Sequence, residues 1–155
     1  MTINFEACRR KYRPDKIKFL LIAEAPPKKE SGRFFYYQNV KNGDSLFLET
    51  MKVLYPDEYS DTKTVRQQKE NFLKRFQKDG FYLIDSTDEP MKDSTSSNKM
   101  KQIERNLPNL INKIKDLISQ DTKIILISAT VYEVCIASLE SNGFNIINDG
   151  AIPFP

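Results

Sequence analysis

One carboxylate stands where an open α/β sheet would present it to a ligand. An apolar run over residues 17–23 stops on Glu24, and Ala25, Pro26 and Pro27 follow. The pattern predicts a buried strand that delivers Glu24 to a rigid turn, because ligands of parallel α/β sheets bind just beyond the carboxyl ends of the strands. A carboxylate there could orient water or stabilise a developing cation. A side chain that merely faces water in a loop fits the same pattern equally well.

A second acidic side chain, Asp85, follows the short apolar run of residues 81–84. A carboxylate accepts hydrogen bonds and donates none, so Asp85 suits the donors of a purine or cytosine edge better than uracil. A cap or turn role in the polar loop that follows explains Asp85 equally well.

Carboxylates near the predicted strand ends leave a magnesium-dependent phosphoryl-transfer enzyme open as an alternative. The acidic residues concerned are Glu24, Asp85, Asp88, Glu89 and Asp149. Their spacing matches no known signature, and the sequence contains neither of the common glycine-rich nucleotide loops. A catalytically inactive domain that binds nucleic acid or protein is a third reading.

Aromatic and basic residues follow the first predicted strand. Phe34, Phe35 and Tyr36 could stack on an extruded base, each contributing about 1–3 kcal/mol, although packing in the core is the commoner role for any one ring. Residues 1–33 contain nine basic and four acidic side chains, a balance of +5 within a net charge of +3. This uneven charge could line a groove for phosphates, with Lys28, Lys29 and Arg33 as contacts, or form a solvated basic face.

Length and composition predict one domain spanning residues 1–155, because 155 residues that are 39% hydrophobic can bury one core but hardly two. No apolar run is long enough to cross a bilayer or to form a signal peptide, so we expect a cytoplasmic protein without membrane contact. Cys8 and Cys135 are predicted to be free thiols. The oligomeric state is open, with a monomer as the default.

Four strands alternating with helices are predicted. The strands are expected over residues 17–23, 81–84, 123–128 and 144–147, and the helices over 46–55, 64–78, 103–118 and 130–142. Pro108 should kink or restart the third helix, and Thr130 should cap the fourth. Ser128 and Thr130 also lie where N–H groups at a helix start could receive a phosphate.

The alternation predicts a three-layer α/β/α sandwich around a four-stranded parallel sheet, because parallel neighbours need helical crossovers. A further helix normally packs after the last strand of this architecture. We therefore expect the chain to be truncated at its C-terminus, after Pro155.

The order of these elements resembles the uracil-DNA glycosylase superfamily. That family places a Gly-Glu-x-Pro-Gly turn after its first strand, and residues 23–27, Ala-Glu-Ala-Pro-Pro, are similar with both glycines replaced. Residues 124–130 resemble its third strand entering a helix, and residues 152–155, Ile-Pro-Phe-Pro, resemble its second motif. Outside these turns the resemblance rests on element order.

The resemblance implies a DNA-binding hydrolase of DNA repair that excises a base and uses no cofactor and no resident metal. It implies Glu24 as the catalytic residue, and Arg33, Lys28, Lys29, Ser128 and Thr130 as contacts to DNA. The implied base-binding residues are Ala25, Pro26, Phe34, Phe35, Tyr36, Asp85, Pro153 and Phe154. The chain contains no histidine, so it lacks the imidazole that stabilises the departing uracil anion in many members. A slow N-glycosylase and a binding-only relative are both compatible with that departure.

Overall fold

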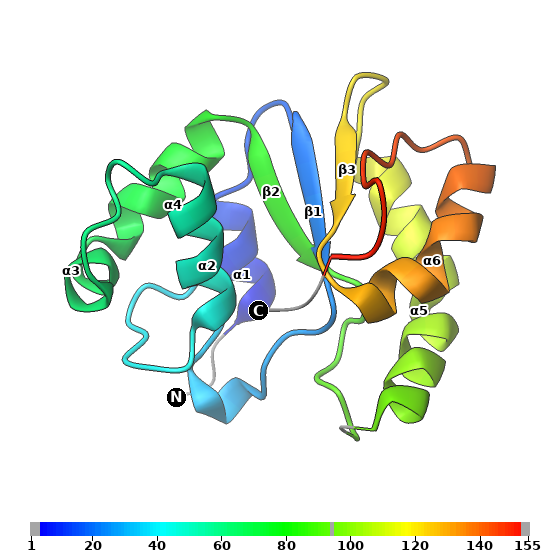
Figure 1. Ribbon diagram of the computed structural model, residues 1–155, viewed down its shortest axis with the longest axis horizontal. Helices are drawn as coiled ribbons and strands as arrows, with labels where there is room; N and C mark the ends of the chain where they lie inside the picture. Colours follow the sequence, from blue (N-terminus) through cyan, green and yellow to red (C-terminus); the bar gives the residue numbers. More distant parts are fainter. Residues whose placement is uncertain (1–3, 94, 153–155) are drawn as a thin grey trace. The chain divides into compact units, whose positions relative to one another are not determined.

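The computed structural model describes residues 4–93 and 95–152 (Figure 1). The contacts within the chain divide it into two compact units. We call the described residues of 1–13 and 27–79 the helical unit, and those of 14–26 and 80–154 the sheet unit. The mixed α/β class is confirmed, whereas the single domain and the three-layer arrangement stay predictions.

The sheet unit is built on a parallel sheet whose central strand is the first apolar run of the sequence. The strands are β1 (Phe19–Ala23), β2 (Phe81–Asp85) and β3 (Lys123–Leu126), in the order β2-β1-β3. In register, Leu21 of β1 lies between Leu83 and Ile125. Leu20 and Ile22 are fully buried, which explains why this strand reads as a continuous apolar run rather than an alternating one.

The predicted fourth strand over residues 144–147 is wrong, because the described sheet has three strands and only an isolated bridge between Ile124 and Ile146. The backbone of Ile124 bonds to Asn145 and Ile147, at 2.8 and 3.0 Å. One pair further along, the side-chain amide of Asn148 bonds both the N–H and the C=O of Leu126, each at 2.8 Å. A side chain therefore takes the place of the next backbone pair and ends the ladder.

Two helices of the sheet unit, α5 (Ser96–Leu117) and α6 (Ala129–Ser141), contact each other and lie on one face of its sheet (Figure 1). Helix α5 does not restart at Pro108, since its apolar stripe of Ile103, Leu110 and Ile114 is fully buried on both sides of the proline. Tertiary packing outweighs the lost backbone hydrogen bond.

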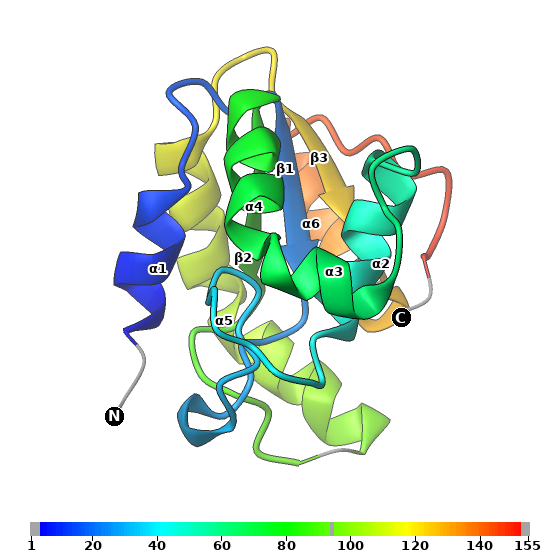
Figure 2. The ribbon, with the colours of Figure 1, turned by 90° about the vertical axis from the view of Figure 1, so that its left-hand side faces the viewer.

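The helical unit contains α1 (Phe5–Lys11), the short 3-10 helix η1 (Lys29–Ser31), α2 (Ser45–Leu54), α3 (Thr62–Gln67) and α4 (Lys69–Lys78). The single helix predicted over residues 64–78 is wrong, because the chain turns at Gln68 between α3 and α4 (Figure 2). Asp61 caps α3, and its carboxylate accepts from the N–H of Thr64 at 2.9 Å. Helix α1 was not among the predicted helices.

Both cysteines are free thiols, as predicted, and Cys135 is fully buried within α6. Burial raises the pKa of the Cys135 thiol to about 12, which keeps it protonated and unreactive. In the described part of the chain, no helix combines the length and the apolar character needed to cross a bilayer.

Candidate functional site

Glu24 lies directly after β1, and two side chains of the sheet unit hold its carboxylate. Its Oε2 accepts a hydrogen bond from the Ser128 hydroxyl at 2.7 Å, and its Oε1 lies 3.5 Å from the Lys99 ammonium. The Glu24 side chain is 12% exposed. The carboxylate is therefore fixed in direction at the carboxyl end of the sheet while a small part of it remains accessible.

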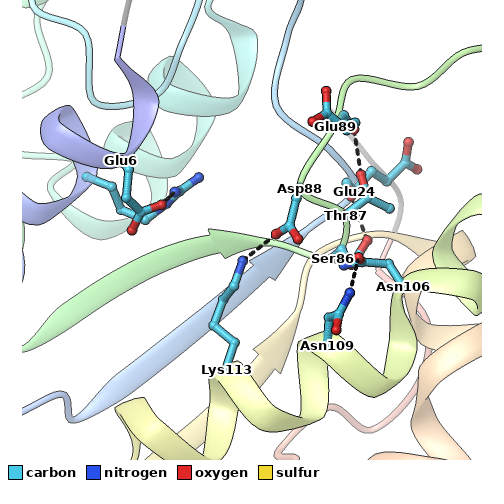
Figure 3. Close-up of polar contacts among 10 residues, drawn as sticks. Glu6, Glu24, Ser86, Thr87, Asp88, Glu89, Asn106, Asn109 and Lys113 are labelled. Carbon is cyan, nitrogen blue, oxygen red and sulfur yellow. Dashed lines mark hydrogen bonds and ion pairs between the residues drawn. The ribbon is translucent and has the colours of Figure 1, made fainter.

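The backbone of Glu24 is held as firmly as its side chain. Its carbonyl accepts from the Ser86 hydroxyl at 2.5 Å and from the N–H of Thr87 at 3.2 Å, and the Ser86 N–H donates to the Ala23 carbonyl at 2.8 Å. Figure 3 shows Glu24 beside these two residues at the end of β2. Ser86 and Thr87 are buried, so the chain segments that leave β1 and β2 are joined by bonds shielded from water.

Ser128 connects Glu24 to the start of α6. It is the N-cap of the helix, since its hydroxyl oxygen accepts from the Val131 N–H at 3.3 Å while its proton goes to Glu24. The predicted cap, Thr130, is wrong: Thr130 lies in the first turn, because the helix already begins at Ala129. The phosphate role predicted for Ser128 and Thr130 stays a prediction.

The remaining predicted residues of the sheet unit lie close to Glu24 in the chain or in the sheet register. Ala25 and Pro26 continue the turn after Glu24, the first half-buried and the second buried. Asp85 is the last residue of β2, opposite Ala23, and only 5% exposed. Its predicted contact with a base edge stays a prediction. Pro153 and Phe154 lie outside the described residues.

The three candidate stacking rings are packed within the helical unit. Phe34 and Tyr36 are 1% exposed and Phe35 is 5% exposed. Phe34 stacks on Phe5 with ring centroids 4.2 Å apart, and Phe35 meets Phe47 edge-on at 5.7 Å. Aromatic neighbours thus cover the surfaces that a base would need, and stacking would require a ring to leave this cluster.

The predicted DNA-contacting cations of the helical unit are exposed. Lys28 precedes η1 and Lys29 begins it, while Arg33 follows shortly after. The aliphatic part of Arg33 lies against Gly43, whose φ is +72°, and a Cβ at Gly43 would stand 2.2 Å from the Arg33 Cδ. The positive φ favours glycine at position 43, and any larger residue would displace the exposed Arg33 side chain from its present position. Contact of these cations with DNA stays a prediction.

Sequence reasoning missed a hollow of about 290 Å³ between the end of β2 and α5. Its lining residues are Thr87, Asp88, Glu89, Lys92, Gln102, Arg105 and Asn106. It also missed Lys99, the ionic partner of Glu24. A polar helix face is ordinarily solvated, so no local signal in residues 99–106 distinguishes these side chains from solvent-facing ones.

The five carboxylates named for the magnesium alternative do not gather in one cluster, although Asp88 and Glu89 line the same hollow. Across residues 4–93 and 95–152, no group of three or more His, Cys, Asp or Glu side chains lies close enough to hold a metal ion. Asp88 instead pairs with Lys113, with its Oδ1 2.7 Å from the ammonium (Figure 3). The described residues thus contain no such group of three, and the magnesium-dependent alternative stays a prediction.

Comparison with known proteins finds no matching family model, no matching curated protein and no matching solved structure.

Proposed function

We propose that this chain is a divergent uracil-DNA glycosylase-like protein that binds DNA and hydrolyses the N-glycosidic bond of a damaged or deaminated base. Glu24 is the catalytic carboxylate in this proposal. The observation that carries it is the fixed position of Glu24 at the carboxyl end of the central strand, 12% exposed and held by Ser128 and Lys99. Ligands of parallel α/β sheets bind at that edge.

The reaction needs a negative charge near the sugar and a way to receive the electrons of the breaking bond. As the bond between C1′ and the base nitrogen breaks, the sugar gains positive charge, and the base takes the electron pair. Glu24 stabilises the cation or orients the water that adds to C1′. The proton that this water releases passes to solvent or to the departing base. Lys99, 3.5 Å from Glu24, supplies a positive charge for the departing anion in a chain without histidine.

Binding without turnover is the second candidate, and the packing of the aromatic residues favours it. Phe34, Phe35 and Tyr36 all have other rings against them, so the surface predicted to hold an extruded base is occupied within the helical unit. A protein that binds the phosphates of DNA through exposed cations needs no surface on which an extruded base stacks.

Base release from defined oligonucleotides tests the proposal. Single- and double-stranded oligonucleotides containing uracil or hypoxanthine are incubated with excess protein, and released base is followed in a single turnover. Glu24→Gln should lower the rate about 10²–10³-fold, because it removes one preorganised stabiliser of developing charge. Glu140→Gln, which changes an exposed acid of α6, is the matched control and should behave as the unaltered chain.

Each outcome separates the candidates. Equal rates for the unaltered chain and Glu24→Gln would remove Glu24 from the mechanism. DNA binding that weakens with salt, without release of any base, would establish the binding-only candidate. If the chain releases no base and shows no salt-dependent binding to DNA, the assignment to DNA is refuted.

A further inference from the structure

The hollow between β2 and α5 is held open by a side chain of the helix. Gln102 donates from its amide to the carbonyls of Glu89 and Pro90, at 3.3 and 3.1 Å, and accepts from the N–H of Lys92 at 3.1 Å. One amide thus fixes the backbone of the loop at three places. Surface loops are ordinarily the mobile part of a fold, and these three hydrogen bonds tie the backbone of residues 89, 90 and 92 to α5.

A second amide, one helical turn further along α5, fixes the floor of the hollow. Asn106 donates to the carbonyl of the buried Ser86 at 2.8 Å, and Asn109 donates to the Asn106 side-chain oxygen at 3.3 Å (Figure 3). The Thr87 hydroxyl donates to the Glu89 carbonyl at 2.7 Å. The hollow is therefore formed before any ligand arrives, which lowers the entropy lost on binding.

Two cationic side chains line the hollow without an ion-pair partner among the described residues. The side chains of Lys92 and Arg105 are on exposed residues, and neither forms a hydrogen bond or an ion pair among the described residues. Arginine presents a planar fork of donors that matches phosphate oxygens. These two side chains favour an anionic group with several acceptor oxygens.

The same hollow contains acceptors for a neutral part of a ligand. The carboxylates of Asp88 and Glu89 line it, and the charge of Asp88 is already offset by Lys113. Carboxylates accept from hydroxyl and amino groups. A ligand that fits both kinds of lining carries a phosphate at one end and hydroxyl or amino donors at the other.

We propose that this hollow binds a nucleotide, with its phosphate on Arg105 and Lys92 and its sugar hydroxyl near Asp88 and Glu89. The volume of about 290 Å³ lies at the lower end of the range of small-molecule sites, which suits one nucleotide unit. A free mononucleotide and one nucleotide of a DNA strand share this chemistry. The inference concerns binding alone, so it holds whether or not Glu24 performs hydrolysis.

Calorimetric titration of the full chain tests the inference. The probes are thymidine 5′-monophosphate, thymidine, inorganic phosphate and a short single-stranded oligothymidylate, none of which contains a damaged base. The nucleotide should bind more tightly than thymidine or phosphate, and Arg105→Gln should weaken it about tenfold or more, because a charge-assisted contact is lost. Lys101→Gln removes the same charge from an exposed place on α5 outside the hollow and should leave the affinity unchanged.

The arms of the titration also identify the source of the nucleotide. Binding of the monophosphate that Arg105→Gln weakens indicates a free nucleotide, whereas binding of the oligonucleotide alone, again weakened by Arg105→Gln, indicates a strand. Thymidine that binds as tightly as its monophosphate, equal effects of Arg105→Gln and Lys101→Gln, or no binding of any probe would overturn the inference. Circular dichroism of both variants confirms that they fold.

Discussion

Lys69 is a buried amine whose removal should change how stability depends on pH. It begins α4, is 1% exposed, donates to the Phe34 carbonyl at 3.2 Å and lies over the Phe47 ring at 4.5 Å. The pKa of Lys69 is lowered from 10.5 to about 7, chiefly by burial and also by the charge of Arg66, while Asp44 and Cys8 partly oppose the shift. The free amine is thus the form that the folded chain favours above neutral pH.

The sign and size of the effect follow from proton linkage. Between about pH 7 and 10.5 the unfolded chain holds a proton on Lys69 that the folded chain has released, so the free energy of unfolding rises with pH. Below about pH 7 both states are protonated, and the cost of burying the ammonium no longer changes. A shift from 10.5 to about 7 corresponds to roughly 4–5 kcal/mol over the whole range, at up to about 1.4 kcal/mol per pH unit.

Urea unfolding of the unaltered chain and Lys69→Met, at several pH values from 6.5 to 9.5, measures this contribution. Groups common to both proteins cancel in the difference. Lys69→Met should be relatively most stable at pH 6.5 and should lose that advantage as the pH rises, although the Phe34 carbonyl loses its donor at every pH. Lys74→Met, which changes a 61% exposed lysine of the same helix, should show a nearly level difference. A level difference for Lys69→Met would refute the neutral buried amine.

Two further substitutions test the contacts of Ser128 and Asp44. Ser128→Ala should lower the free energy of unfolding by about 1 kcal/mol, because α6 loses its cap, while Thr130→Ala should cost less than about 0.5 kcal/mol in the same urea titration; the reverse order would restore Thr130 as the cap. Asp44→Asn should cost about 2 kcal/mol or more, since it leaves Arg66, bonded at 2.6 Å and 24% exposed, without its carboxylate. Asp44→Asn should also lower the pKa of Lys69 further, because the charge of Asp44 raises that pKa. The dependence of unfolding on pH should therefore extend to lower pH, and an unchanged pH profile would contradict the interaction between Asp44 and Lys69.

The strands of the sheet unit were predictable because burial on both faces leaves a continuous apolar run. Residues 17–23, 81–84 and 123–128 each contain the observed strand or nearly all of it. Residues 144–147, Phe-Asn-Ile-Ile, are also mostly apolar, yet they form only a bridge, because the Asn148 side chain occupies the next pairing position. Apolar pattern alone does not show which polar side chain ends a ladder.

Helix ends were less predictable than helices, because several residues near a helix start can accept the same N–H group. Thr130 matches a capping box, but Ser128 stands where the chain leaves β3 and is also bonded to Glu24. The break between α3 and α4 at Gln68 contains no proline or glycine that would have predicted it, and the buried Lys69 follows it directly.

The mixed α/β class and the place of Glu24 at a strand end could be predicted from the chain alone, because both depend on the order of apolar and polar residues. The surroundings of Glu24 and the hollow beside α5 could not be predicted in this way, because they are formed by segments far apart in the sequence. Ser128 and Lys99 reach that carboxylate from distant segments, and the hollow beside α5 exists because Gln102 holds a loop open. Such contacts depend on where a helix lies against its sheet, a long-range property that local pattern does not encode.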